Sequence, residues 1–149
     1  MDDQAYMRIA MNEARQAAAE DEVPIGCVIV SKDGDILARD HNRKEALKTA
    51  TGHAEILAIN AASHRIGNWH LNDCTLYVTL EPCMMCSGAI YQSRIGKVVI
   101  GARDSRWPGL VTFLNDYPLN HQPEIEFSEL GEECLTILQD YFHQKRRKS

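Results

Sequence analysis

The sequence predicts an α/β fold, a sandwich in which helices pack around one mixed sheet. Two observations predict it. Segments with the apolar spacing of helices alternate along the chain with short apolar runs typical of buried strands. The 149 residues also contain no internal repeat, low-complexity tract or linker, and this length fits one compact domain spanning residues 1–149.

The first part of the chain predicts a helix and then a strand. Residues 5–20 are rich in alanine and methionine, and their apolar positions recur at helical spacing. Asp2 or Asp3 is placed to cap this helix. Residues 24–30 form an apolar run that predicts a buried strand.

A hairpin and a second helix are expected next. Asp33-Gly34 is a strong turn signal, and residues 35–39 would form the returning strand. Residues 40–52 are polar, and we expect them to be irregular. Apolar residues within 53–64 then predict a helix over about that range.

The second half predicts further alternation. Residues 74–80 read as a strand, which ends at Pro82 because proline breaks a ladder but suits the first turn of a helix. A helix over about 83–93 and a buried strand over 97–101 should follow.

The last part begins with a long segment, residues 104–122. A loop of this length in a small domain is usually functional. A final strand over 124–128 and a final amphipathic helix over about 132–146 are expected after it.

The net charge of the chain argues against a non-specific nucleic-acid binder. Its net charge is −5 and its pI about 5.6, whereas a dedicated, non-specific nucleic-acid binder is usually basic. The charge is uneven, however, because residues 145–148 are all basic. A local basic patch of this kind can bind phosphates.

The cysteines indicate a reducing compartment. There are five, an odd number that includes a Cys-x-x-Cys pair, and no secretory leader precedes them. No apolar run approaches the roughly 20 residues of a membrane span. We therefore expect a cytoplasmic protein that does not enter a membrane.

Two short motifs carry the chemistry: His-Ala-Glu at 53–55 and Pro-Cys-Met-Met-Cys at 82–86. Imidazole and thiolate are the ligands that zinc prefers, and a catalytic zinc keeps three protein ligands plus one water. His53, Cys83 and Cys86 supply three such ligands. Both motifs lie where a helix should begin, and the helix dipole and free N–H groups there stabilise thiolates.

Glu55 makes the predicted site hydrolytic. Zinc lowers the pKa of bound water from about 15.7 to about 7, and a base must take the proton. Residues two apart on a regular helix do not face the same way, so we expect His53 to lie at the helix start. His-x-Glu…Pro-Cys-x-x-Cys is the known signature of zinc-dependent nucleobase deaminases, so we expect hydrolytic deamination.

Three other interpretations are open. A structural four-ligand zinc site could recruit Cys74 or His64. A thioredoxin-like redox role would use the two cysteines of the second motif and leave the first motif unexplained. A non-catalytic, zinc-stabilised binding module would need the metal to fold but would not need Glu55.

Over nearly its whole length the chain resembles the bacterial tRNA-specific adenosine deaminases of the cytidine deaminase superfamily. The matching blocks are residues 74–90, 93–104, 22–26, 41–43 and 120–121. The resemblance implies a cytidine-deaminase-like, three-layer α/β/α sandwich with a five-stranded mixed sheet, one Zn²⁺ per subunit and a homodimer. It also implies conversion of the wobble adenosine of a tRNA anticodon loop to inosine, with release of ammonia.

The resemblance also implies roles for single residues. By motif position, Asn42 would hydrogen-bond the extruded base and Val23 would line its pocket. Asp104 would hold the nucleotide or the flanking strand, and Phe142 with the basic end of the last helix would meet the anticodon stem-loop. Residues 105–119 depart from the family pattern, with Trp107 where small residues are usual. That departure and the net charge favour an alternative: deamination of a free base or nucleoside such as guanine or cytosine.

Overall fold

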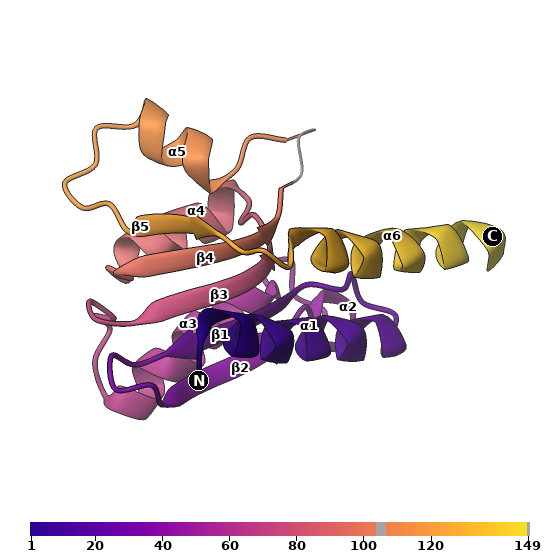
Figure 1. Cartoon of the computed structure of the whole chain (residues 1–149), viewed down its shortest axis with the longest axis horizontal. Coiled ribbons are helices and arrows are strands. Elements are labelled where there is room, and N and C mark those ends of the chain that lie inside the picture. The colour runs from indigo at the N-terminus through magenta and orange to yellow at the C-terminus, as the bar shows by residue number, and fades with distance from the viewer. Residues whose placement is uncertain (104–106, 149) are drawn as a thin grey trace.

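The computed structural model describes residues 1–103 and 107–148, and its helices and strands alternate as expected (Figure 1). In chain order the elements are α1 (Asp3–Ala19), β1 (Gly26–Val30), β2 (Ile36–His41), α2 (Lys44–Leu47), α3 (Ala54–Ile66), β3 (Thr75–Leu80), α4 (Met84–Gln92), β4 (Lys97–Ala102), α5 (Leu110–Asp116), β5 (Glu124–Phe127) and α6 (Gly131–Lys148).

The strands form one mixed sheet in the order β2-β1-β3-β4-β5. β1 pairs antiparallel with β2 and with β3, while β3, β4 and β5 are parallel to one another. Parallel neighbours need a crossover connection, and α4 lies between β3 and β4 in the chain as α5 lies between β4 and β5. The predicted five-stranded mixed sheet is confirmed.

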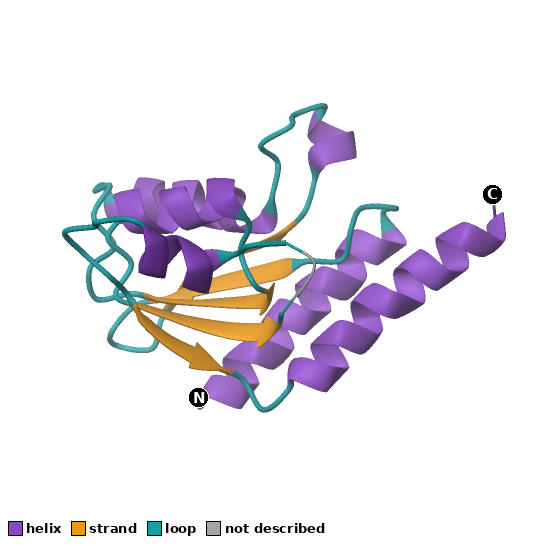
Figure 2. Ribbon diagram, turned by 90° about the horizontal axis from the view of Figure 1, so that it is seen from above, coloured by secondary structure: helices purple, strands orange, loops and turns teal. Residues whose placement is uncertain are grey.

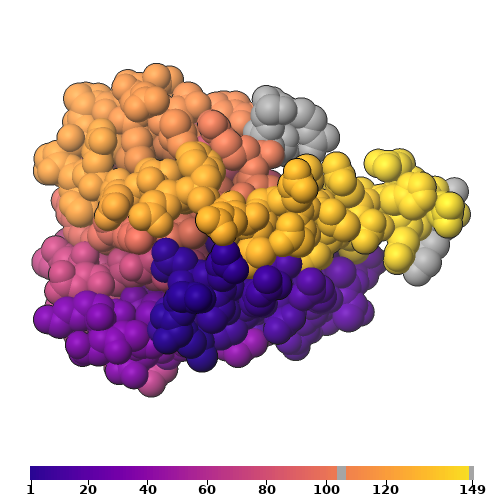
Figure 3. Space-filling view, viewed as in Figure 1, coloured from indigo at the N-terminus to yellow at the C-terminus, as the bar shows by residue number. Residues whose placement is uncertain are grey.

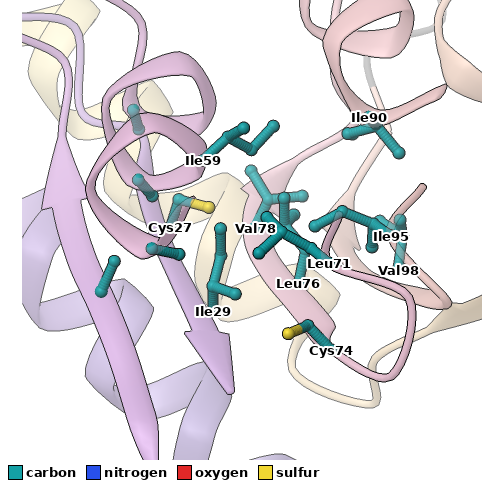
Figure 4. Close-up of a cluster of buried hydrophobic side chains, with 14 of the residues drawn as sticks. Cys27, Ile29, Ile59, Leu71, Cys74, Leu76, Val78, Ile90, Ile95 and Val98 are labelled. Atoms are coloured by element: carbon teal, nitrogen blue, oxygen red, sulfur yellow. The ribbon is translucent and has the colours of Figure 1, made fainter. Parts of the chain in front are cut away.

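Helices cover both faces of this sheet (Figure 2). α1 and α6 lie side by side over one face, where their side chains form a continuous surface (Figure 3). Successive residues of a strand face opposite sides, so Val28 and Val30 pack beneath these two helices, whereas Cys27 and Ile29 pack beneath α3 (Figure 4). The α/β/α sandwich is therefore confirmed. Among the described residues, no helix has the length and apolarity needed to cross a membrane.

Local signals explain the first helix and the hairpin. Oδ1 of Asp2, one of the two expected caps, accepts a hydrogen bond from the Ala5 N–H at 2.9 Å. The hairpin turn contains Gly34 with a φ of 91°, a conformation that glycine adopts without strain. β2 continues to His41, beyond the predicted end, because His41 still pairs with Gly26 of β1.

Two segments expected to be irregular contain short helices, so that expectation was wrong for α2 and α5. Each helix receives a cap from a carboxylate far away in the sequence. Glu22 accepts hydrogen bonds from the N–H groups of Glu45 and Ala46 at 3.1 and 2.8 Å. Glu81 accepts one from the Val111 N–H at 3.0 Å. Carboxylates at helix N-termini satisfy N–H groups that otherwise have no partner.

Candidate active site

The two sequence motifs meet where α3 and α4 begin. His53 is the N-cap residue of α3 and Cys83 is that of α4, and both have extended backbone. Cys86 lies in the first turn of α4, three residues on, so the two thiols face the same side. Nδ1 of His53 lies 3.7 Å from Sγ of Cys83 and 3.6 Å from Sγ of Cys86.

This donor set fits zinc. A tetrahedral zinc with Zn–N of about 2.0–2.1 Å and Zn–S of about 2.3 Å places nitrogen and sulfur about 3.6 Å apart. Both separations from the His53 nitrogen agree with that value. Cys86 is buried, His53 is half-buried and Cys83 is exposed, so solvent reaches the site on the side of Cys83.

Neither candidate for a fourth protein ligand can join these donors. His64 lies in the last turn of α3, about 16 Å along the helix from His53. Cys74 directly precedes β3, whose length of about 20 Å separates it from residues 81–83, the loop between β3 and α4 that we call the metal-binding loop. In the described part of the chain three side chains could therefore hold the metal here, the number that corresponds to a catalytic rather than a structural zinc.

Cys86 and His53 favour the thiolate form of Cys83. A hydrogen bond from Cys86, supported by a further one from His53, lowers the pKa of Cys83 to about 3. The bond with Cys83 in turn raises the pKa of His53. The hydrogen bond between the two thiols, together with burial, raises the pKa of Cys86. Metal binding favours the deprotonated form of each thiol.

Glu55 lies in the first turn of α3 beside these donors and is buried. Its Oε1 is a buried side-chain oxygen that has no hydrogen-bond partner among the described residues. Burial raises the pKa of Glu55 to about 7. An unpartnered buried oxygen is rare and needs an explanation. A carboxyl that titrates near neutral pH can both accept and donate a proton, which suits acid–base work.

Asn42 joins the strand side of the site to the start of α3. It is buried, and its backbone N–H donates to the Ile25 carbonyl at 3.2 Å. Its side-chain Oδ1 accepts a hydrogen bond from the Ala54 N–H at 2.8 Å. Because the oxygen is engaged in this way, the side-chain Nδ2 is left as the donor for another group.

The structure describes two of the three other residues named by resemblance. Val23 is half-buried in the turn between α1 and β1. Phe142 is half-buried on α6, on the opposite face from α3 and α4, and its ring makes an edge contact with Tyr141 at 5.3 Å. Asp104 lies outside the described residues.

A second cluster resembles a metal site by distance alone. Glu13, Asp40 and His41 bring donor atoms within 4.8 Å of one another. However, Arg39 holds Glu13 at 2.9 Å and Arg43 holds Asp40 at 2.7 Å. These guanidinium groups already neutralise the carboxylates, so the cluster is a network of ion pairs that ties α1 to β2.

Glu81 was missed by reasoning from the sequence. Its side chain is 4% exposed, and it accepts hydrogen bonds from Arg103 at 3.1 Å and from the Val111 N–H at 3.0 Å. The available signal was its position, since a carboxylate that follows a buried strand and directly precedes Pro82 and Cys83 belongs to the metal-binding loop.

Three zinc donors beside the buried carboxyl group of Glu55 are suited to activating water. With the His-x-Glu and Pro-Cys-x-x-Cys motifs on this α/β/α sandwich, they define the class as the zinc-dependent hydrolytic deaminases. The chain belongs to the cytidine and deoxycytidylate deaminase zinc-binding family, whose model matches residues 1–102.

Individual relatives and solved structures show which deaminases the chain is similar to. The chain is 45% identical to a tRNA-specific adenosine deaminase of Streptococcus pyogenes, over 99% of this chain and 95% of that protein. It is 39% identical, with a TM-score of 0.85, to a structure from a study of A-to-I editing by tRNA:A34 deaminases, covering 91% of this chain and 99% of the other. A guanine deaminase of Bacillus subtilis is 29% identical, with a TM-score of 0.68, over 96% and 95%. The resemblance found in the sequence is confirmed.

Proposed function

We propose that this protein deaminates the wobble adenosine of a tRNA anticodon loop, giving inosine and ammonia. The observation that carries the proposal is the similarity to tRNA deaminases over nearly the whole chain, at 45% and 39% identity, combined with the zinc-donor geometry at the starts of α3 and α4.

In this proposal His53, Cys83 and Cys86 hold the zinc, which supplies the Lewis acidity that makes a water nucleophilic near neutral pH. Glu55 takes a proton from the attacking water and delivers it to ring nitrogen 1 of adenine, so carbon 6 becomes more electrophilic. Glu55 next carries the proton of the new hydroxyl group to the amino group. The carbon–nitrogen bond then breaks, a carbonyl forms and ammonia leaves.

Asn42 and Val23 would hold the base in position. The target base has to leave the stack of the loop, at modest cost in a single strand. The free Nδ2 of Asn42 would donate a hydrogen bond to the base, since Oδ1 is engaged at the start of α3. The half-buried Val23 would cover a face of the base.

Other parts of the chain would bind the rest of the RNA. α6 runs beyond the end of the sheet at which β4 ends (Figure 1), and exposed basic residues lie along its final turns. Phe142 and these basic residues would contact the anticodon stem-loop, and Asp104 would hold the nucleotide or the flanking strand. A local basic patch serves this purpose although the net charge of the chain is −5.

The protein would work in the cytoplasm as a homodimer. Its five cysteines are free, which suits a reducing compartment. Exposed apolar side chains on α2 and α4, Leu47 at 50% and Met84 at 44%, offer surface that a second subunit would cover.

The test compares substrates directly. The zinc-loaded protein is incubated with an anticodon stem-loop containing the wobble adenosine, and separately with free guanine, cytosine and adenosine. We expect inosine in the stem-loop. Deamination of a free base alone would refute the proposal and favour the second candidate, a free-base deaminase, which the similarity to guanine deaminase supports. A Glu55→Gln protein serves as the inactive control.

A further inference from the structure

Trp107 stands out among the exposed side chains. It is 71% exposed, and among the described residues only Met1 is a more exposed large hydrophobic side chain. Within the described part of the chain its ring contacts no other ring, whereas the other tryptophan, Trp69, packs against His70 with centroids 3.6 Å apart. A single exposed apolar side chain needs no explanation by itself, so Trp107 points to a binding role only when a second feature places it near a site.

Glu81 is that second feature, because it holds the chain on both sides of Trp107. On one side Arg103 donates to Glu81 at 3.1 Å, and on the other the Val111 N–H donates at 3.0 Å. A Cβ on Gly109 would lie 2.7 to 2.9 Å from atoms of the Glu81 side chain. The backbone therefore passes directly against this buried carboxylate two residues after Trp107.

Glu81 also belongs to the metal-binding loop. Its N–H donates to the Ala102 carbonyl at 2.8 Å, and Pro82 alone separates it from the zinc ligand Cys83. The chain that carries Trp107 is thus fixed to the loop that carries the metal. Trp69, by contrast, follows the C-terminal end of α3, a helix about 20 Å long that begins at the metal site.

We infer that Trp107 is a stacking platform for a nucleobase adjacent to the target adenosine. The inference rests on the proposed function. Unpaired bases of RNA loops stack readily on aromatic side chains. Every base has a flat face, so such a contact tolerates different sequences and acts mainly on binding. The proposed function already assigns Asn42 and Val23 to the target base, so we assign Trp107 to one of its neighbours.

The first experiment measures inosine formation with Trp107→Ala on an anticodon stem-loop. Loss of one stacked base raises KM about 5- to 150-fold, with kcat little changed, and Trp107→Tyr keeps most of the affinity. Trp69→Ala is the matched control, since Trp69 is also well exposed, at 58%, and its KM stays that of the wild type.

The second experiment identifies the stacked base. Stem-loops are prepared in which the nucleotide on either side of the target lacks its base, one at a time. On the stem-loop that lacks the stacked base, Trp107→Ala causes no further loss. If the substitution raises KM equally on the intact stem-loop and on both abasic ones, or on none of the three, the stacking role is refuted.

The third experiment uses fluorescence, because the chain has only two tryptophans. With Glu55→Gln to prevent turnover, Trp69→Phe leaves Trp107 as the sole reporter, and stem-loop binding quenches it. Trp107→Phe leaves Trp69, whose emission stays constant. Absence of quenching in the first protein refutes the inference. Wild-type activity on the stem-loop shows separately whether the proposed function holds.

Discussion

The side-chain amide of Asn42 serves two purposes, which two substitutions can separate. Oδ1 accepts the Ala54 N–H at 2.8 Å, and both residues are buried, Asn42 at 4% and Ala54 at 0% exposure. Asn42→Ala leaves that N–H without a partner away from water, which costs about 1–3 kcal/mol. In a chain of this length each kcal/mol lowers Tm by roughly 2–4 °C, so the expected fall is about 2–12 °C.

Asn42→Asp keeps an oxygen that accepts the same hydrogen bond, and a negative charge is favourable at a helix start. We expect its Tm to fall less than that of the alanine variant. Both variants lack the Nδ2 donor, and both should lose about tenfold or more in kcat/KM on the stem-loop. Thermal melts, zinc content and initial rates of inosine formation measure these effects. Wild-type kcat/KM in Asn42→Asp would show that the base does not need Nδ2, and equal Tm values in both variants would show that the helix cap contributes nothing.

Three further changes test other parts of the structure. Glu55→Gln should lower kcat by about 10²- to 10⁴-fold while elemental analysis still finds one zinc per chain; zinc loss would contradict a proton-transfer role. Burial opposes the shift, but a hydrogen bond with His41 helps to lower the pKa of Glu13 below its ordinary value of 4.5. The ionised Glu13 therefore stabilises the folded protein above that pH, and this stabilisation is lost as the pH falls through the lowered pKa. Glu13→Gln should therefore lower Tm more at pH 7 than at pH 3 in melts followed by circular dichroism. Gly26→Ala places a Cβ 1.9 Å from a backbone oxygen of α1 and should lower stability by about 1–3 kcal/mol or more in urea unfolding, whereas Gly88→Ala meets nothing within 4 Å and should not.

Much of the sheet and the zinc donors could be predicted because their signals are local. The strands β1, β3 and β4 lie between layers of helices, and a strand covered on both faces is apolar along its length. Zinc ligands are recognisable from residue type and spacing alone, and His53, Cys83 and Cys86 do come together as expected.

The remaining features depend on partners that are distant in the sequence. The residues next to α2 and α5 do not predict a helix, because the capping carboxylates are distant in the sequence. Glu22 caps α2 and Glu81 caps α5. The buried position of His41 likewise depends on Glu13 of α1 and on Glu20, the C-cap residue of α1, whose side-chain oxygens lie 2.8 and 3.0 Å from its two ring nitrogens. Such pairings become visible only once the topology has placed α1 against β2.

The spacing of His53 and Glu55 shows how much chemistry depends on where α3 begins. Inside a helix, residues two apart point about 200° away from each other, so a ligand and its proton carrier could not share one site. Asn42 removes this conflict, since its bond to the Ala54 N–H lies where the first helical turn starts and leaves His53 extended. The imidazole can then meet Cys83 and Cys86 across the gap to α4 while Glu55 stays in the first turn. The helix boundary, and not the motif by itself, therefore places the proposed ligand His53 and the proposed proton carrier Glu55 together.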